Sequence, residues 1–284
     1  MKNCTTKLLN KARPKRADFC YNIDMKKEIL TEITKVVQEC GNLIREVGRK
    51  SLDIKEKTSV RDVVTEYDVA TQDRIIKHLS GKFPEAGFIS EELATDTFPE
   101  NELVFVIDPI DGTMNFTKDM GYSCISVACF KDKKPYVGVV YDPYRDEMFA
   151  ATLGGGAFCN NQPVHVTSQP LSSSLVQTGT SSYYPELRNE IIKRFKTIMP
   201  KCIDIRIQGS GALGICQVAT GRAGLYFEIK ISLWDYAAAA LILTEAGGEI
   251  LNLNGDPIPY AFEKTSIIAG PINNIKESGL TPSL

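Results

Sequence analysis

The sequence predicts a mixed fold of α-helices and β-strands, and three observations lead to this prediction. Apolar residues recur at intervals of three and four in residues 30–47 and again in residues 64–79, as in amphipathic helices. Residues 103–107 form an unbroken apolar run, which is typical of a strand buried on both faces. Three β-rich runs between residues 124 and 153 are separated by charged and turn residues, which predicts an antiparallel meander.

Composition excludes several classes of protein. The formal net charge of −2 provides no field that would attract nucleic acid or an anionic membrane, and no apolar run approaches the roughly 18 residues of a membrane span. Eight cysteines occur without a Cys-x-x-Cys pair, which favours reduced thiols in a cytoplasmic protein over a disulfide framework or a zinc site. Because the chain has only two histidines, a histidine-rich metal site and a Ser-His-Asp triad are both disfavoured.

The N-terminal segment differs from the rest of the chain. Residues 1–24 are charged and lack periodicity, so we expect a flexible tail, with the first helix starting at Met25 and ending near Gly48. A start of the natural protein at Met25 is one explanation of the tail, and N-terminal sequencing of the native protein tests it. The polar, lysine-rich residues 51–61 predict an exposed loop.

The second helix is predicted to begin near Thr65 and to end at Gly81. Asp68 stands at the third position after Thr65, where an acid commonly caps a helix. A short strand at residues 87–90 then ends in Glu91 and Glu92. Neighbouring residues of an extended chain face opposite ways, so only one of these two acids readily points into a site.

The second half alternates between strands and helices. Helices are predicted at residues 185–199, 211–219 and 234–246, and strands at residues 174–178, 202–207, 223–228, 249–253 and 266–269. The alanine-rich third helix suits close packing, and it carries Asp235 in its first turn, where the helix dipole favours an acid. The run Gly154-Gly155-Gly156 predicts a turn, because neither a lysine nor a helix pattern follows it.

The most informative stretch follows the buried run, where Asp108 and Asp111 flank Pro109. Proline stiffens the turn, Gly112 lets the backbone approach a ligand closely, and Thr113 opens a helical turn whose free N–H groups favour an anion. Mg²⁺ prefers such oxygen ligands together with substrate phosphate. Asp-Gly is also a common turn pair, so an ordinary turn is the alternative.

Two motifs resemble the signatures of the inositol monophosphatase family of metal-dependent sugar-phosphate phosphatases. They are Asp108-Pro-Ile-Asp-Gly-Thr-Met-Asn-Phe116 and Leu233-Trp-Asp-Tyr-Ala-Ala-Ala-Ala240, and the resemblance runs from about Met25 to the C-terminus. It implies a layered αβαβα sandwich, with an α+β part at residues 25–160, an α/β part at residues 161–284 and the metals between them. Homodimers and inhibition by lithium are further family traits that the resemblance implies.

The resemblance also implies a set of metal ligands. Asp108 would bridge two Mg²⁺ ions, Glu91 and the carbonyl of Ile110 would complete one site, and Asp111 and Asp235 would complete the other. A third, weaker Mg²⁺ near Glu91 is typical of the family, and Mn²⁺ is a possible substitute. Four converging acids repel one another unless cations neutralise them, which favours metal binding over four independent caps or strand ends.

The remaining roles follow from the same resemblance. Thr113, hydrogen-bonded to Asp68, would orient the attacking water, with Glu91 as a further catalytic residue, and the amides of Gly112 and Thr113 would hold the phosphate. The substrate-binding residues would be Asp111, Gly209, Ser210, Gly211 and Glu228. The chain departs from the family pattern at Ser90, Ser210 and Gly211, which leaves the polyol open. Lys57 also matches a family position, although an ordinary surface lysine is the simpler interpretation.

The predicted function is a Mg²⁺-dependent phosphomonoester hydrolase that acts on a small polyol or sugar phosphate, with myo-inositol 1-phosphate first. Fructose 1,6-bisphosphate, a 3′(2′),5′-bisphosphate nucleotide and histidinol phosphate are alternative substrates, because related families share the core motif. Glu228 favours a polyol over a nucleotide, since an acceptor-only group suits hydroxyl donors. A third hypothesis is an RNA- or protein-binding module that uses the basic tail.

Overall fold

A computed structural model describes residues 16–47, 54–59, 62–93, 97–181 and 183–282. The first helix, α1 (Arg16–Val47), begins at Arg16 and not at Met25 as the sequence predicted. The sequence between Arg16 and Met25 contains neither proline nor glycine, so nothing in it interrupts the helical hydrogen bonds. The part of the predicted tail before Arg16 lies outside the described residues.

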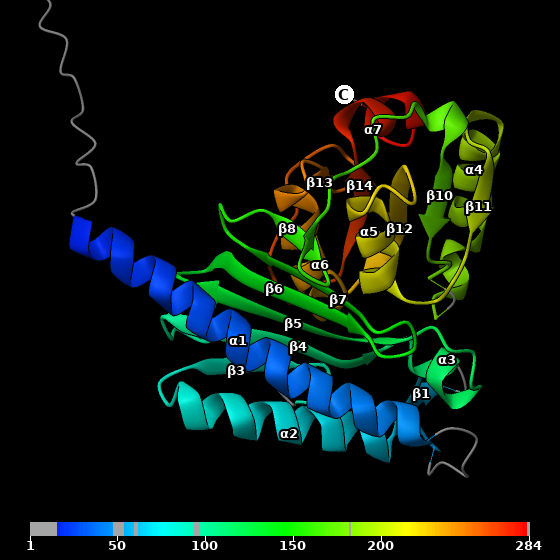
Figure 1. The fold of residues 1–284 in the computed structure, drawn as a ribbon. Helices are drawn as coiled ribbons and strands as arrows, with labels where there is room; N and C mark the ends of the chain where they lie inside the picture. The colour runs from blue at the N-terminus through cyan, green and yellow to red at the C-terminus, as the bar shows by residue number, and fades with distance from the viewer. Residues whose placement is uncertain (1–15, 48–53, 60–61, 94–96, 182, 283–284) are drawn as a thin grey trace, which may run out of the picture.

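The first sheet has seven strands in the order β3-β4-β5-β6-β7-β8-β9. β3 pairs in parallel with β4, and every later pair is antiparallel, which confirms the predicted meander. The helices α1 and α2 (Glu66–Lys82) lie against one face of this sheet (Figure 1). The strands are β3 (Gly87–Ser90), β4 (Leu103–Asp111), β5 (Cys124–Lys131), β6 (Lys134–Asp142), β7 (Glu147–Thr152), β8 (Ala157–Cys159) and β9 (Gln162–Pro163).

The second sheet has five strands in the order β11-β10-β12-β14-β13, with parallel and antiparallel pairs. The helices α5 (Gly211–Ala219) and α6 (Leu233–Glu245) lie between the two sheets, and α4 (Arg188–Ile198) and α7 (Ile272–Ser278) lie on the outer side (Figure 1). The αβαβα layering is therefore confirmed. The strands are β10 (Leu175–Thr178), β11 (Asp204–Arg206), β12 (Leu225–Ile231), β13 (Glu249–Leu251) and β14 (Thr265–Gly270).

Three apolar cores correspond to the contacts between these layers. The largest surrounds α6, whose four consecutive alanines, Ala237 to Ala240, are all buried. Gly138 of β6 lies so close to α6 that an added Cβ would be 2.6 Å from the carbonyl oxygen of Ala238. Small residues on both sides thus let the helix lie directly on the sheet, and this contact fixes the first turn of α6 beside the end of β4.

Three segments differ from their predictions. The strands β1 (Ile54–Ser59) and β2 (Asp62–Thr65) form an antiparallel hairpin, although a loop was predicted at residues 51–61. The prediction missed β1 because strand pairing, and not apolar periodicity, defines it. The side chains of Lys57 and Val64 lie outside the described residues. β4 does not stop before Asp108 but continues to Asp111. The helix α7 was not predicted, because it is too short to show a clear apolar period.

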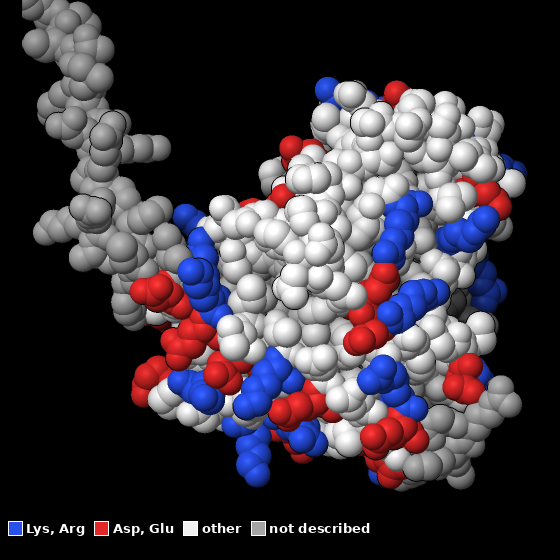
Figure 2. All heavy atoms as spheres, in the orientation of Figure 1, with Lys and Arg blue, Asp and Glu red and all other residues white. Residues whose placement is uncertain are grey.

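Other connections match their predictions or remain untested. Residues 154–156 lie in a turn, as predicted. Short 3₁₀ turns lie at Leu171–Ser173, Pro185–Leu187 and Met199–Lys201. The division at residue 160 stays a prediction. None of the described helices combines the length and apolarity needed to cross a membrane. In Figure 2, acidic and basic side chains alternate over the layer of α1 and α2 and are sparser above it.

Candidate active site

A bulge at the end of β4 brings its two acids to one side of the sheet. Asp108 pairs with Ser126 of β5 and Asp111 pairs with Cys124, so three steps on β4 oppose two on β5. Residues three apart on a regular strand face opposite ways, and the extra residue reverses this. Pro109 fits within the bulge because it has no N–H to donate to the ladder. Both carboxylates are buried, with exposed fractions of 1% and 7%.

The first turn of α6 supplies a third acid to the same place. The carboxylate of Asp235 accepts a hydrogen bond from the backbone N–H of Ser232 at 3.0 Å, as a capping acid does. One carboxylate oxygen from each of Asp108, Asp111 and Asp235 lies within 4.8 Å of the other two. The capping role of Asp235 is present and is compatible with metal binding, and the predicted convergence of these three acids is observed.

The site strongly disfavours three negative charges. Burial, followed by the charges of Glu91, Asp111 and Asp235, raises the pKa of Asp108 well above its usual range. Burial and the charges of Asp111 and Glu91 raise the pKa of Asp235 in the same way. Clustered carboxylate oxygens whose charges are mutually repulsive are a donor set that fits hard divalent cations such as Mg²⁺ and Mn²⁺. Asp108, Asp111 and Asp235 are the residues that would hold such a cation.

Asp111 is oriented by donors from the second half of the chain. Its Oδ2 accepts hydrogen bonds from Ser210 Oγ at 2.6 Å and from the N–H of Ala212 at 2.7 Å, and its Oδ1 accepts from the N–H of Gly211 at 3.3 Å. Burial nevertheless raises the pKa of Asp111 to about 6, despite these donors. Ser210 also caps α5 by accepting from the N–H of Leu213 at 3.3 Å, so this cap fixes the carboxylate as well.

Glu91 lies beside the three acids but is not one of the group within 4.8 Å. It follows β3, and its backbone N–H donates to the carbonyl oxygen of Ile107 at 3.3 Å. Its charge raises the pKa of both Asp108 and Asp68, which places it near them. Its role as a metal ligand stays a prediction. Ser90, the residue before Glu91, is buried, and its hydroxyl has no hydrogen-bond partner among the described residues. Such an unsatisfied buried hydroxyl can still donate or accept a hydrogen bond.

Thr113 and Asp68 meet at the start of α3 (Thr113–Thr117). Thr113 Oγ1 lies 3.0 Å from Ile110 O and 3.3 Å from Asp68 Oδ1, so its single proton can be donated to either acceptor. Asp68 binds Thr65 more closely, accepting from its N–H at 2.8 Å and from its hydroxyl at 2.5 Å. Burial raises the pKa of Asp68 to about 6. The capping role of Asp68 and the predicted contact with Thr113 are both present.

The loop before α5 packs directly on the β4 turn. Gly112 has φ +91°, and a Cβ on it would lie 3.0 Å from the carbonyl oxygen of Gly209. Asn115 Nδ2 donates to Tyr122 O at 2.8 Å and to Gln208 O at 2.6 Å, and so joins the loops. Asn115 was not predicted to have this role. Its place within the central motif was a signal, but nothing in the sequence indicated a contact 93 residues away.

Glu228 lies in β12, within electrostatic range of Asp111. Its Oε2 accepts from the hydroxyl of Tyr226 at 2.5 Å, and its Oε1 accepts from Ser181 Oγ at 3.5 Å. A Cβ on Gly179 would overlap the Glu228 carboxylate, so the backbone there touches it directly. Burial raises the pKa of Glu228 to about 7, and the charge of Asp111 adds to this effect. The strand continues to Ile231, beyond the strand end predicted at Glu228.

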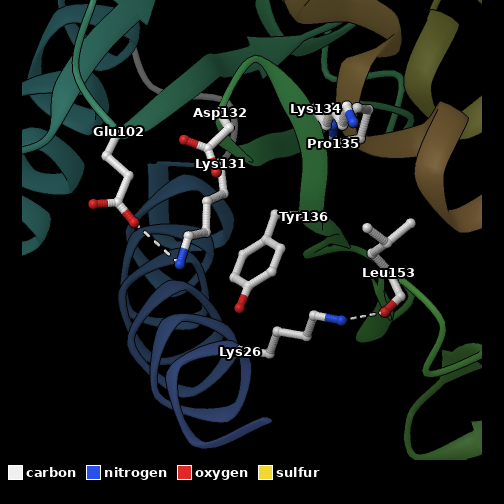
Figure 3. Close-up of a pocket in the computed structure, with 8 residues that line it drawn as sticks. All are labelled: Lys26, Glu102, Lys131, Asp132, Lys134, Pro135, Tyr136 and Leu153. Carbon is white, nitrogen blue, oxygen red and sulfur yellow. Dashed lines mark hydrogen bonds and ion pairs between the residues drawn. The ribbon is translucent and has the colours of Figure 1, made fainter. Parts of the chain in front are cut away.

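A surface cavity of about 560 Å³ lies at the opposite end of β5, away from these acids (Figure 3). Two of the three lysines that line it, Lys26 and Lys131, have partners. Lys131 lies 3.1 Å from the carboxylate of Glu102, and the ammonium group of Lys26 donates to the carbonyl oxygen of Leu153. The cavity therefore has no free group for catalysis among these two lysines, and the chemistry belongs to the carboxylate cluster.

Fold and site together define a layered α/β protein with a buried carboxylate centre suited to divalent cations. The model of the Inositol monophosphatase family matches residues 25–283. The chain belongs to this family, as its two motifs predicted, and its acidic cluster is consistent with the metal-dependent phosphatases of that family.

Similar proteins carry two kinds of name. Inositol monophosphatase 3 of Solanum lycopersicum is 36% identical over 237 residues, which cover 80% of this chain and 87% of the relative. Nus factor SuhB of Pasteurella multocida is 34% identical over 223 residues, which cover 78% of this chain and 84% of the relative. The crystal structure of extragenic suppressor protein SuhB from Bartonella henselae aligns with a TM-score of 0.83 and 28% identity, over 90% of this chain and 100% of that one.

Proposed function

We propose that this chain is a Mg²⁺-dependent phosphatase that releases phosphate from a small polyol phosphate, with myo-inositol 1-phosphate as the first candidate substrate. The observation that supports this proposal most strongly is the convergence of Asp108, Asp111 and Asp235 within 4.8 Å. Two elements 124 residues apart in sequence supply these acids, and each acid has its pKa raised by burial and by its neighbours. Such an arrangement destabilises the protein unless it binds cations.

Bound Mg²⁺ would neutralise the carboxylates and polarise a phosphoryl oxygen as a Lewis acid. Asp108, Asp111 and Asp235 are the side chains proposed to hold it, with Glu91 and the carbonyl of Ile110 as further ligands. The hydrogen bonds from Ser210, Gly211 and Ala212 keep Asp111 in a fixed orientation, so little reorganisation is needed on binding.

Thr113 and Asp68 are proposed to position the attacking water. The Thr113 hydroxyl lies within hydrogen-bond distance of both Ile110 O and Asp68 Oδ1, and in the reacting complex it would direct a lone pair at the water. Gly112 has a left-handed conformation at the start of α3, and we propose that the amides of Gly112 and Thr113 hold the phosphate. Catalysis would then consist mainly of positioning and charge neutralisation, as is usual for phosphoryl transfer.

Glu228 and the backbone of Gly209, Ser210 and Gly211 are proposed to contact the polyol. A buried carboxylate that accepts hydrogen bonds can select hydroxyl groups, and Tyr226 and Ser181 fix its orientation. The name of the Solanum lycopersicum relative supports inositol phosphate as substrate. Fructose 1,6-bisphosphate, a 3′(2′),5′-bisphosphate nucleotide and histidinol phosphate remain alternatives for the same metal core.

A panel of phosphate esters tests the proposal. Phosphate release from myo-inositol 1-phosphate, fructose 1,6-bisphosphate, adenosine 3′,5′-bisphosphate and histidinol phosphate is measured with Mg²⁺ and with EDTA. We expect Mg²⁺-dependent release that is greatest for a polyol ester and nearly abolished by Asp108→Asn. Wild-type turnover in that variant at saturating Mg²⁺ would contradict the assignment of Asp108.

A second candidate is a module that binds RNA or protein partners, and it stays open because the Pasteurella multocida relative is named a Nus factor and not a phosphatase. Binding to RNA that weakens steeply with salt, without Mg²⁺-dependent hydrolysis of any ester in the panel, would support it over the phosphatase. A homodimer and a cytoplasmic location are proposals that rest on the family resemblance and on the cysteine pattern. Light scattering on the purified protein tests the first of them.

A further inference from the structure

Two lysines lie close to one aromatic ring, in a position that the proposed chemistry does not use. The ammonium group of Lys230 lies 3.8 Å from the ring centroid of Tyr184, and that of Lys264 lies 5.6 Å from the same centroid. Both distances are within the range of cation–π attraction. The ring therefore holds two like charges near each other, an arrangement that an anion between them would stabilise.

Strand pairing places these lysines at one end of β12 and β14, close along the chain to Glu228 of the proposed polyol site. Lys230 follows Glu228 by two residues on β12, within a bulge where three steps on β12, from Glu228 to Ile231, oppose two on β14. Ile231 pairs with Thr265 of β14, so Lys264 lies next to Lys230 at the same end of the two strands.

The loop that carries Tyr184 contacts the same carboxylate. Ser181 Oγ lies 3.5 Å from Glu228 Oε1 and 3.4 Å from the carbonyl oxygen of Lys230. The backbone carbonyl of Ser181 accepts a hydrogen bond from the N–H of Tyr184 at 2.9 Å. This single loop therefore joins the Glu228 carboxylate to the aromatic ring that both lysines approach.

Neither lysine forms a salt bridge within the described part of the chain. Neither ammonium group lies within 4.0 Å of a carboxylate there. Burial alone would lower the pKa of Lys264. The hydrogen bond with Tyr184 and the charges of Asp235 and Glu91 outweigh burial and raise this pKa above its usual value, so the ammonium group stays charged.

We propose that Lys230 and Lys264 form an anion subsite next to Glu228, and that this subsite selects substrates that carry a second phosphate on the alcohol that leaves. The inference rests on the proposed function, because it assigns the scissile phosphate to the carboxylate cluster. Lysine is a compact, mobile charge that suits a phosphate group whose exact position varies among sugars. Glu228 would then accept from a hydroxyl between the two phosphates.

The test compares two substrates that differ only in the second phosphate. The ratio of kcat/KM for fructose 1,6-bisphosphate to kcat/KM for fructose 1-phosphate is measured for the wild type, for K230M, for K264M and for the double variant. We expect a wild-type ratio of about ten or more, since a charge-assisted hydrogen bond contributes at least about a factor of ten. Each single substitution should lower the ratio several-fold, and the double substitution should bring it near one.

Lys276→Met is the matched control, because Lys276 is an exposed lysine on α7. It should leave the wild-type ratio in place. Thermal melting checks that each variant folds, and the exposed Lys264 carries the test alone if the Lys230 variant melts early. A wild-type ratio near one, or a ratio that survives the double substitution while fructose 1-phosphate and myo-inositol 1-phosphate are still hydrolysed, overturns the subsite and leaves the proposed function standing. Absence of Mg²⁺-dependent hydrolysis of every ester overturns both.

Discussion

Replacing Asp108 by Asn should stabilise the metal-free protein while it abolishes activity. Asp108 contributes one of three carboxylate oxygens that lie within 4.8 Å of one another. At this separation, and with an effective dielectric constant of about 20, two unit charges repel by roughly 3 kcal/mol. The substitution removes two of the three repulsions and keeps the size of the side chain.

The net gain is smaller than the sum of these repulsions, because protonation already relieves part of the strain, as the raised pKa values of the three acids indicate. We expect the metal-free D108N protein to gain about 2 kcal/mol at pH 8. For a chain of this size, that corresponds to a rise in Tm of roughly 3–4 °C. Asn also keeps an acceptor for the N–H of Ile110, which now donates to Asp108 Oδ1 at 3.1 Å.

The assay is differential scanning calorimetry in EDTA and in saturating Mg²⁺. In EDTA the variant should melt above the wild type, whereas Mg²⁺ should raise the Tm of the wild type far more than that of the variant. Asp73→Asn removes an exposed acid on α2 and is the control, for which both differences should be near zero. A D108N protein that melts below the wild type in EDTA would refute the claim that the cluster is electrostatically strained.

Three further predictions concern other parts of the site. Thr113→Ala should lower kcat on the order of a hundredfold, while Thr113→Ser retains most activity because it keeps the hydroxyl; equal losses in both would contradict a role for the hydroxyl. In EDTA, Tm should fall as pH rises from about 4 to about 7, because folding raises the pKa of Asp68 and Asp111 to about 6 and that of Glu228 to about 7. The stabilising contribution of these groups is present below their unfolded-state pKa values and is lost as pH rises through the folded-state values. Mg²⁺ should flatten this dependence of Tm on pH, and a Tm that rises with pH in EDTA would disprove the argument. Gly179→Ala should raise KM for the polyol ester about tenfold, because the new Cβ displaces the Glu228 carboxylate, whereas Gly81→Ala, which meets nothing within 4 Å, should leave KM unchanged; equal KM values in the two variants would separate Gly179 from substrate binding.

Apolar periodicity and short local signals predicted most helices and strands and the cap at Thr65, and both operate within a few turns of chain. The layered fold and the convergence of the acids on β4 and α6 were implied by the resemblance to the family. The motif resemblance then related segments that lie more than 100 residues apart.

Several features were beyond the reach of local patterns. The hairpin of β1 and β2 depends on strand pairing and not on a buried apolar face, so its polar residues indicated a loop. The bulge between Asp108 and Asp111 is a matter of register with β5, and the sequence of β4 alone showed only a proline. Asn115 and Ser181 act through partners 93 and 47 residues away, and such contacts leave no periodic trace.

The most direct test of the central claim is the position of Mn²⁺ in a soaked crystal, located by anomalous X-ray scattering. The account predicts an anomalous peak that contacts carboxylate oxygens of Asp108, Asp111 and Asp235 together, at the roughly 2 Å typical of such ligands. No peak there at saturating Mn²⁺, or a peak confined to another surface of the protein, would contradict it.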